Sequence, residues 1–205
     1  MAEFRLYWDY MSEQLDWIRR VVGVFDALGL RYALIGGHAV SFHWRPRVTV
    51  DVDFLVPAAS LPRLEAALPG AGFLVERRGE ILRAWNAGAD PAVDEPIVDF
   101  VPAEYNETQR EVVRTAIEAD YQGVPLRIAS RAAVVALKFL SAISPTRQQL
   151  DKMQDVTDLG HIVRQRWTIK HQAEALRLVE RSYAGGGSEL GKLVDDIQHG
   201  RPITI

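Results

Sequence analysis

The chain lacks several features that mark particular classes of protein. It has no cysteine, so neither disulfides nor thiolate metal sites can form, which is compatible with a reducing compartment. No apolar run approaches the ~20 residues that a transmembrane helix requires. Acidic residues are interspersed among the first apolar ones, which argues against a cleavable signal sequence. We therefore expect a soluble, cytoplasmic protein with no membrane partner.

A strong excess of one charge is also missing. The 24 basic and 27 acidic residues give a formal net charge of −3, so any RNA substrate would need a local basic patch. Apolar residues make up 48% of the chain and charged residues 25%, which is typical of a soluble globular protein. The histidines show no zinc-ligand spacing, and no nucleophile elbow, Walker loop, dinucleotide fingerprint or internal repeat is present.

The most informative stretch is residues 31–56, in which two apolar runs flank a glycine pair. The second run, Thr49 to Val56, contains Asp51 and Asp53. Alternate residues of a strand share a face, and two such Cα atoms lie about 6.5 Å apart. Both carboxylates could then bind one hard cation such as Mg²⁺ or Mn²⁺. The alternative is a solvated strand face, but the apolar neighbours favour a buried strand, where carboxylates need partners.

The glycine pair and two arginines suggest how an anion could be bound beside these aspartates. Gly36 and Gly37 lack Cβ atoms, so a phosphate could approach the backbone there. A helix over 38–44 would add amide donors at its N-terminus. Arg45 and Arg47 precede the aspartates, and either guanidinium could bind a triphosphate. The alternative is that Arg47 only neutralises an aspartate.

Hydrophobic periodicity and turn residues predict an α/β (α+β) protein with a small mixed sheet flanked by helices. We expect a catalytic core over 1–129 and a helical part over 130–205, which could pack together as one unit. Within the first helical segment, Ser12 is a candidate N-cap, and Gly29 is expected to end the helix. Ser130 is expected to cap the first helix of the second part. The expected helices are 3–28, 60–69, 107–119, 132–143, 147–165, 172–183 and 189–197, and the expected strands are 31–35, 48–56, 73–76, 81–85, 96–101 and 124–128.

The joined motif resembles the polymerase-beta-like nucleotidyltransferase superfamily, and most closely its AbiEii-type branch, many members of which are toxins of toxin–antitoxin pairs. The pattern is G-G-x-A followed by R-x-T-x-D-x-D. It is met here by Gly36, Gly37, Ala39, Arg47, Thr49, Asp51 and Asp53. The resemblance implies the nucleotidyltransferase fold, with the glycine pair beside a triphosphate and the two aspartates holding divalent metals.

The resemblance also implies roles for residues later in the chain. A third carboxylate comes from a later strand, and Asp99 matches it by type and context, as general base or metal ligand; Asp94 and Glu95 are its competitors. A lysine and an aspartate from successive helices complete the cleft. Lys138 matches the lysine, and Asp155 and Asp158 are both candidates for the aspartate. A bound triphosphate would offset the free-energy cost of burying the Lys138 charge. The alternative is a structural ion pair between Lys138 and Asp158.

The expected activity is metal-dependent transfer of a nucleoside monophosphate from an NTP to an acceptor hydroxyl. For a toxin of this branch, the resemblance implies tRNA or protein as acceptor and a cognate antitoxin protein as partner. One alternative is an antibiotic (aminoglycoside or lincosamide) nucleotidyltransferase, and another is an inactive domain that binds a nucleotide or a partner. An acidic acceptor cleft would favour a cationic drug, and a basic groove would favour RNA.

Overall fold

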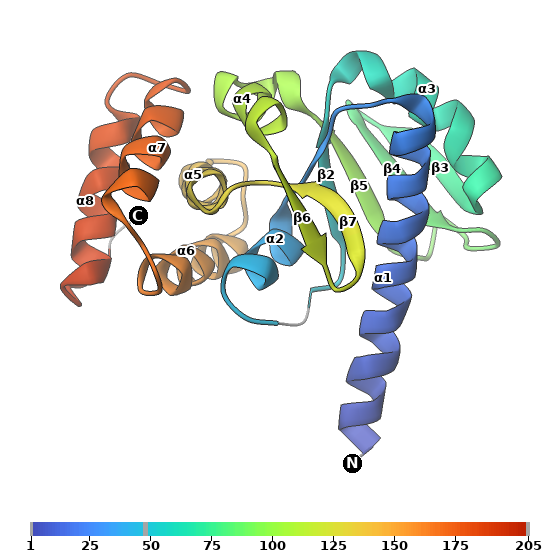
Figure 1. Cartoon of the computed structure of the whole chain (residues 1–205), viewed down its shortest axis with the longest axis horizontal. Helices are drawn as coiled ribbons and strands as arrows, with labels where there is room; N and C mark the ends of the chain where they lie inside the picture. The colour runs from blue at the N-terminus through green and yellow to red at the C-terminus, as the bar shows by residue number, and fades with distance from the viewer. Residues whose placement is uncertain (1, 47–48, 204–205) are drawn as a thin grey trace.

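The computed structural model describes residues 2–46 and 49–203, and its centre is a mixed β-sheet with helices on both faces (Figure 1). Within those residues, seven strands are arranged in the order β3-β4-β5-β2-β1-β7-β6. Their bounds are Ala33–Leu34 (β1), Val52–Val56 (β2), Phe73–Arg78 (β3), Ile81–Asn86 (β4), Val98–Pro102 (β5), Ile117–Tyr121 (β6) and Val124–Ile128 (β7). The mixed α/β class expected from the sequence is confirmed.

The helices divide into a group around the sheet and a group that follows it. The first group is α1 (Ala2–Leu28), α2 (Gly36–His43), α3 (Leu61–Ala67) and α4 (Glu107–Thr115). The second is α5 (Arg131–Ile143), α6 (Gln149–Val163), α7 (Ile169–Glu180) and α8 (Gly186–Gln198). Figure 1 shows the second group gathered on the side of the molecule opposite α1. One hydrophobic cluster extends from α1 through the sheet to α8. No helix in the described ranges is both long and apolar enough to cross a membrane.

Aromatic packing on one face of the sheet sets the direction of the side chains on the other. Phe25 of α1 stacks on Tyr32 at 4.1 Å between ring centroids and meets the edges of Phe54 and Phe100. Phe54 and Phe100 are paired residues of the parallel strands β2 and β5. Because strand side chains alternate, the residues just before each phenylalanine point to the opposite face, away from α1.

The prediction of a helix over 107–119 is wrong over its last four residues, 116–119. Helix α4 ends at Thr115 and β6 begins at Ile117, forming a hairpin with β7 in which Tyr121 pairs with Val124. The turn residues Gln122 and Gly123 have φ values of 54° and 84°, the left-handed pair that tight hairpins favour. The sequence analysis predicted β7 but assigned the first part of its partner strand, residues 117–119, to the preceding helix.

Helix ends agree with the sequence predictions at two positions and differ at one. Gly29 ends α1 with a φ of 60°, and the Ser130 hydroxyl accepts a hydrogen bond from Ala133 N at the start of α5. Ser12 does not cap a helix, because α1 begins at Ala2 and Ser12 lies within it. The backbone of the first turns continues beyond the rest of the molecule (Figure 1).

Candidate active site

Gly36, the first residue of α2, lies against the side chain of Asp53 in β2. A Cβ atom on Gly36 would lie 1.9 Å from Asp53 Oδ2, and Gly36 has a φ of 62°. Both the backbone conformation and the lack of space therefore require glycine. The sequence analysis predicted that the missing Cβ of this glycine lets a phosphate approach the backbone. The structure shows a second role, which is to make room for the carboxylate.

Asp53 belongs to a row of charged residues across three neighbouring strands. It pairs in register with Asp99 of the parallel strand β5, and Asp99 pairs with Arg83 of the antiparallel strand β4. Arg83 Nε lies 3.5 Å from Asp99 Oδ1, and the Asp99 side chain is 19% exposed. The competitors Asp94 and Glu95 lie exposed in the preceding loop. The row therefore brings Asp53 and Asp99 to the same face of the sheet.

Asp51 approaches the same place from just outside the sheet. The expectation that Asp51 lies in a strand is wrong, because β2 begins at Val52 and Asp51 is an exposed residue before it. Thr49 Oγ1 donates to Asp51 Oδ1 at 3.3 Å. Asp51 therefore has the freedom of a loop residue, whereas Asp53 is fixed by the strand.

Burial and neighbouring charge alter the pKa values of Asp53 and Asp99. Burial, followed by the charges of Asp51 and Asp99, raises the pKa of Asp53 to about 7, against the opposing effect of Lys138 and Arg147. Burial also raises the pKa of Asp99, which Arg83 opposes. Like charges held together in a poorly solvated place favour protonation. The same arrangement would be relieved by a bound cation.

The opposite wall of the site is a network of paired charges on the helices. Lys138 Nζ of α5 lies 2.8 Å from Asp155 Oδ1 and 2.9 Å from Asp158 Oδ2, both on α6. Arg147 Nε contacts Asp155 Oδ2 at 2.8 Å. The ion pair considered as the alternative role of Lys138 is thus present, with Asp155 as a further partner. Sequence analysis missed Arg147, which follows the break between the two helices.

These elements enclose a cleft of about 610 Å³. Its charged lining is four carboxylates and two cations, namely Asp51, Asp53, Asp151, Asp155, Lys138 and Arg147. The predicted residues Gly36, Gly37 and Thr49 also line it, whereas Asp99 and Asp158 lie behind the lining. Gln109 of α4 faces the cleft, and its buried Oε1 has no hydrogen-bond partner within the described residues. The predicted Arg47 lies outside the described residues.

The donor set can be compared with what a divalent metal requires. Across residues 2–46 and 49–203, no three histidine or acidic side chains are already close enough together to form a metal cage. The chemistry nevertheless fits, because Asp51, Asp53 and Asp99 provide carboxylate oxygens at a site where burial and the other two carboxylates raise the pKa of Asp53. Asp51 precedes the strand, so a small loop movement could adjust it.

Two solved structures resemble the whole chain. An antigenic nucleotidyltransferase-like protein from Paracoccidioides brasiliensis aligns with a TM-score of 0.55 and 17% identity, over 90% of this chain and 93% of that one. The antibiotic-resistance factor ANT(2'')-Ia aligns with a TM-score of 0.50 and 18% identity, over 93% and 91%. No curated protein sequence matches significantly. At these identities the likeness defines the fold, which is that of the nucleotidyltransferases.

The family follows from a separate comparison. The model of the AbiEii nucleotidyl transferase toxin family, described as a type IV toxin–antitoxin system, matches residues 21–199. The chain therefore belongs to the AbiEii nucleotidyltransferase family. The matched range includes the glycine pair, the aspartates of β2 and β5, and the charged network of α5 and α6.

Proposed function

We propose that the protein transfers a nucleoside monophosphate from an NTP to an acceptor hydroxyl and requires a divalent metal ion, Mg²⁺ or Mn²⁺. The observation that carries this proposal is the position of Asp53. Its carboxylate lies against Gly36, in register with Asp99, and in a cleft that also contains two cationic side chains. Membership of a nucleotidyltransferase family supports the reaction class.

In this proposal, Asp51 and Asp53 hold the metal and Asp99 completes its ligand set or acts as base. When bound, the metal supplies positive charge to the phosphates and to the leaving pyrophosphate. The acceptor oxygen forms a bond to the α-phosphorus as the bond to pyrophosphate breaks, and Asp99 accepts the hydroxyl proton. Catalysis then depends on positioning and charge neutralisation, with no covalent enzyme intermediate.

The cationic residues bind the triphosphate in this scheme. Arg147 has a side chain that is 43% exposed and lines the cleft, so it can exchange Asp155 for a phosphate. Lys138 is more enclosed, at 12% exposure, and remains held by its aspartates while facing the same space. The amides of Gly36 and Gly37 open α2 and add donors for the same anion.

The biological role in this proposal is that of a toxin with a cognate antitoxin protein, acting on tRNA or on a protein hydroxyl. The family description of a type IV toxin–antitoxin system supports this role. An inactive nucleotide- or partner-binding domain is disfavoured, because Asp51, Asp53 and Asp99 are all present.

An antibiotic nucleotidyltransferase is the second candidate. The observation in its favour is the acidic balance of the cleft, with four carboxylates against two cations, which suits a cationic drug. The uptake of label by a drug rather than by a macromolecule would identify it.

The test is incubation of the protein with each labelled NTP and Mg²⁺, in turn with total tRNA, cell protein and an aminoglycoside and lincosamide panel. We expect label in one pool and none with Asp53→Ala, because that variant loses the carboxylate nearest the glycine pair. Glu95→Ala, which removes an exposed acid from the loop before β5, serves as the control and should keep full activity. Transfer by folded Asp53→Ala at saturating metal would refute the assignment.

A further inference from the structure

Three segments without acidic residues meet at one place on the surface. They are residues 27–50, 121–150 and 159–173, none of which contains an aspartate or glutamate. Four exposed cationic residues lie where they meet: Arg45 after α2, Arg164 and Arg166 in the connection from α6 to α7, and Lys170 in the first turn of α7. We call these four residues the basic surface. The overall charge of −3 gives no sign of it.

Specific contacts hold the segments together. The ring of Trp44, next to Arg45, stacks on His161 of α6 with centroids 3.8 Å apart and planes 8° apart. Arg131 of α5 donates to Gln165 O at 3.0 Å and also to His43 O, so it ties the end of α2 to the connection after α6. The basic surface is therefore fixed by packing between elements far apart in the sequence.

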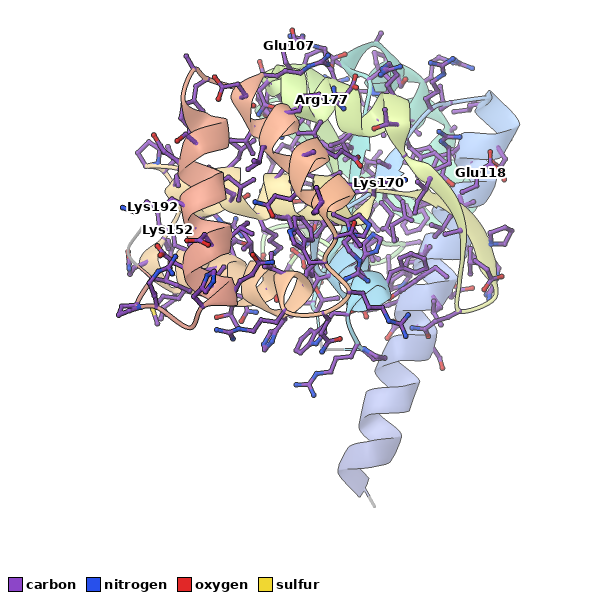
Figure 2. All side chains as sticks on the ribbon, turned by 60° about the vertical axis from the view of Figure 1, so that its left-hand side comes forward. Glu107, Glu118, Lys152, Lys170, Arg177 and Lys192 are labelled. Atoms are coloured by element: carbon purple, nitrogen blue, oxygen red, sulfur yellow. The ribbon has the colours of Figure 1, made fainter. Side chains whose placement is uncertain are left out.

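Within residues 2–46 and 49–203, the cations of the basic surface form no ion pair with an acidic side chain. Among the described residues, no ion pair joins Arg45, Arg164, Arg166 or Lys170 to a carboxylate, although arginines elsewhere on the molecule commonly form such pairs. Figure 2 labels Lys170 at the start of α7 and Arg177 further along the same helix. Arg177 pairs with Glu111 at 3.4 Å, whereas Lys170 has no such partner. Proteins usually intersperse surface charges, so an unneutralised group indicates an anionic ligand.

Aromatic side chains lie among the cations. Arg45 lies over the Trp44 ring, 4.3 Å from its centroid, and Trp167 is half-buried between Arg166 and Lys170. Both faces of Trp44 are therefore occupied, by Arg45 and His161, so it supports the surface rather than stacking on a base. The aromatic side chains therefore hold the cations in place, and the attraction for a polyanion comes from the cations themselves.

The basic surface lies within reach of the cleft along two routes. On α6, Asp155 lines the cleft and His161 contacts Trp44, and the axial rise between them is about 9 Å at ~1.5 Å per residue. Arg45 also precedes Asp51 by only six residues in the sequence. A nucleic-acid strand carries a phosphate every ~3.4 Å of duplex axis, so about three nucleotides would cover that rise.

We propose that the basic surface binds the phosphodiester backbone of an RNA acceptor whose reacting hydroxyl lies in the cleft. This inference rests on the proposed function and adds the place where the acceptor is held. The cleft itself is acidic and would repel a polyanion, so the attraction must come from outside it. Binding of this kind recognises the backbone and is weakened by salt.

The test compares two triple variants that remove the same charge. One is R164Q/R166Q/K170Q, and the control is R19Q/R110Q/K192Q, which changes exposed cations on α1, α4 and α8. The affinity of each protein for total tRNA is measured between 50 and 200 mM salt, together with label transfer and the thermal shift caused by Mg²⁺ and NTP.

For the basic-surface variant, we expect the affinity for tRNA to fall on the order of tenfold or more and the salt slope of log K to decrease by about 2. The control should match the wild type, and the nucleotide-dependent thermal shift should be equal in all three. Equal RNA affinity and transfer in the two variants would overturn the inference, as would exclusive labelling of protein. A wild type with no thermal shift and no transfer would instead refute the proposed function.

Discussion

The two walls of the cleft differ in how far their carboxylates are neutralised by cations. On the sheet, Asp53 and Asp99 share one register, and burial raises the pKa of both, with Arg83 as the neighbouring cation. On the helices, Lys138 lies between two buried aspartates with contacts of 2.8 and 2.9 Å. On the helical wall the buried aspartates are paired with a cation, whereas the sheet wall has an excess of negative charge.

This difference bears on where the proposed metal ion would bind. A buried ion pair with both partners present needs nothing more, and it fixes the relative position of α5 and α6. A buried carboxylate with a pKa near 7 is less stable than it would be with a cation beside it. In the proposed function, the sheet wall binds the metal, and the helical wall keeps its shape while nucleotide enters.

The largest effect should come from removing the cation of the helical wall. Lys138→Met leaves Asp155 and Asp158 buried, each with a side chain 1% exposed, so we expect a loss of about 3–5 kcal/mol in the free energy of unfolding. Urea denaturation at neutral pH measures it. Lys192→Met changes an exposed cation on α8 and should alter stability by less than about 0.5 kcal/mol. Equal losses in the two variants would contradict the contrast between the walls.

On the sheet wall, removing a charge should stabilise the protein when metal is absent. The pKa of Asp53 is raised in the folded state from 3.8 to about 7, so the folded protein holds this proton more tightly than the unfolded chain. Stability is therefore greatest below pH 3.8, as far as this group is concerned, and decreases as the pH rises to about 7.

In a chelator at pH 8, Asp53→Asn should consequently be more stable than the wild type, by at most roughly 4 kcal/mol. The difference should disappear below the ordinary aspartate pKa, and Mg²⁺ with NTP should stabilise only the wild type. Thermal denaturation across pH, with and without Mg²⁺ and NTP, checks both expectations. A wild type more stable than the variant in chelator at pH 8 would show that Asp53 is already neutralised.

Two glycine substitutions separate the effect of backbone strain from that of the close approach of Asp53. Gly29 and Gly36 have φ values of 60° and 62°, but only Gly36 has the Asp53 carboxylate where a Cβ would lie. Gly29→Ala should lower stability by about 1–2 kcal/mol through strain alone. Gly36→Ala should add about 1–3 kcal/mol of overpacking and also displace Asp53, so NTP transfer should fall. Similar stability and activity in both variants would argue against a role for the close contact.

The sequence predicted the elements with strong local signals. The periodic stripe of α1 and the Ser130 cap of α5 needed only neighbouring residues, and both were confirmed. The strand β6 was missed, because residues 117–121 become a strand only by pairing with β7. Asp51 was placed in a strand because its apolar neighbours continue the pattern of β2, although the ladder starts one residue later.

For the site, residue types were predictable but their partners were not. Asp53, Asp99 and Lys138 were identified from the motif and the resemblance, and their catalytic roles remain predictions. Arg147 was missed because its contact with Asp155 depends on how the connection from α5 to α6 turns back. The basic surface was missed because it joins segments whose separate charges are modest, and only the fold brings them together.

The parallel pairing of β2 with β5 holds the two acids side by side independently of the exposed loop that precedes β5. Five consecutive residue pairs, from Val52 with Val98 to Val56 with Pro102, fix Asp53 beside Asp99. The chain between β2 and β5 forms the β3–β4 hairpin and then the exposed residues 92–95. It then returns to pair with β2 through β5. A tag or small domain inserted after Ala92 should therefore leave the spacing of the two acids intact, which makes this loop a convenient attachment point for a reporter.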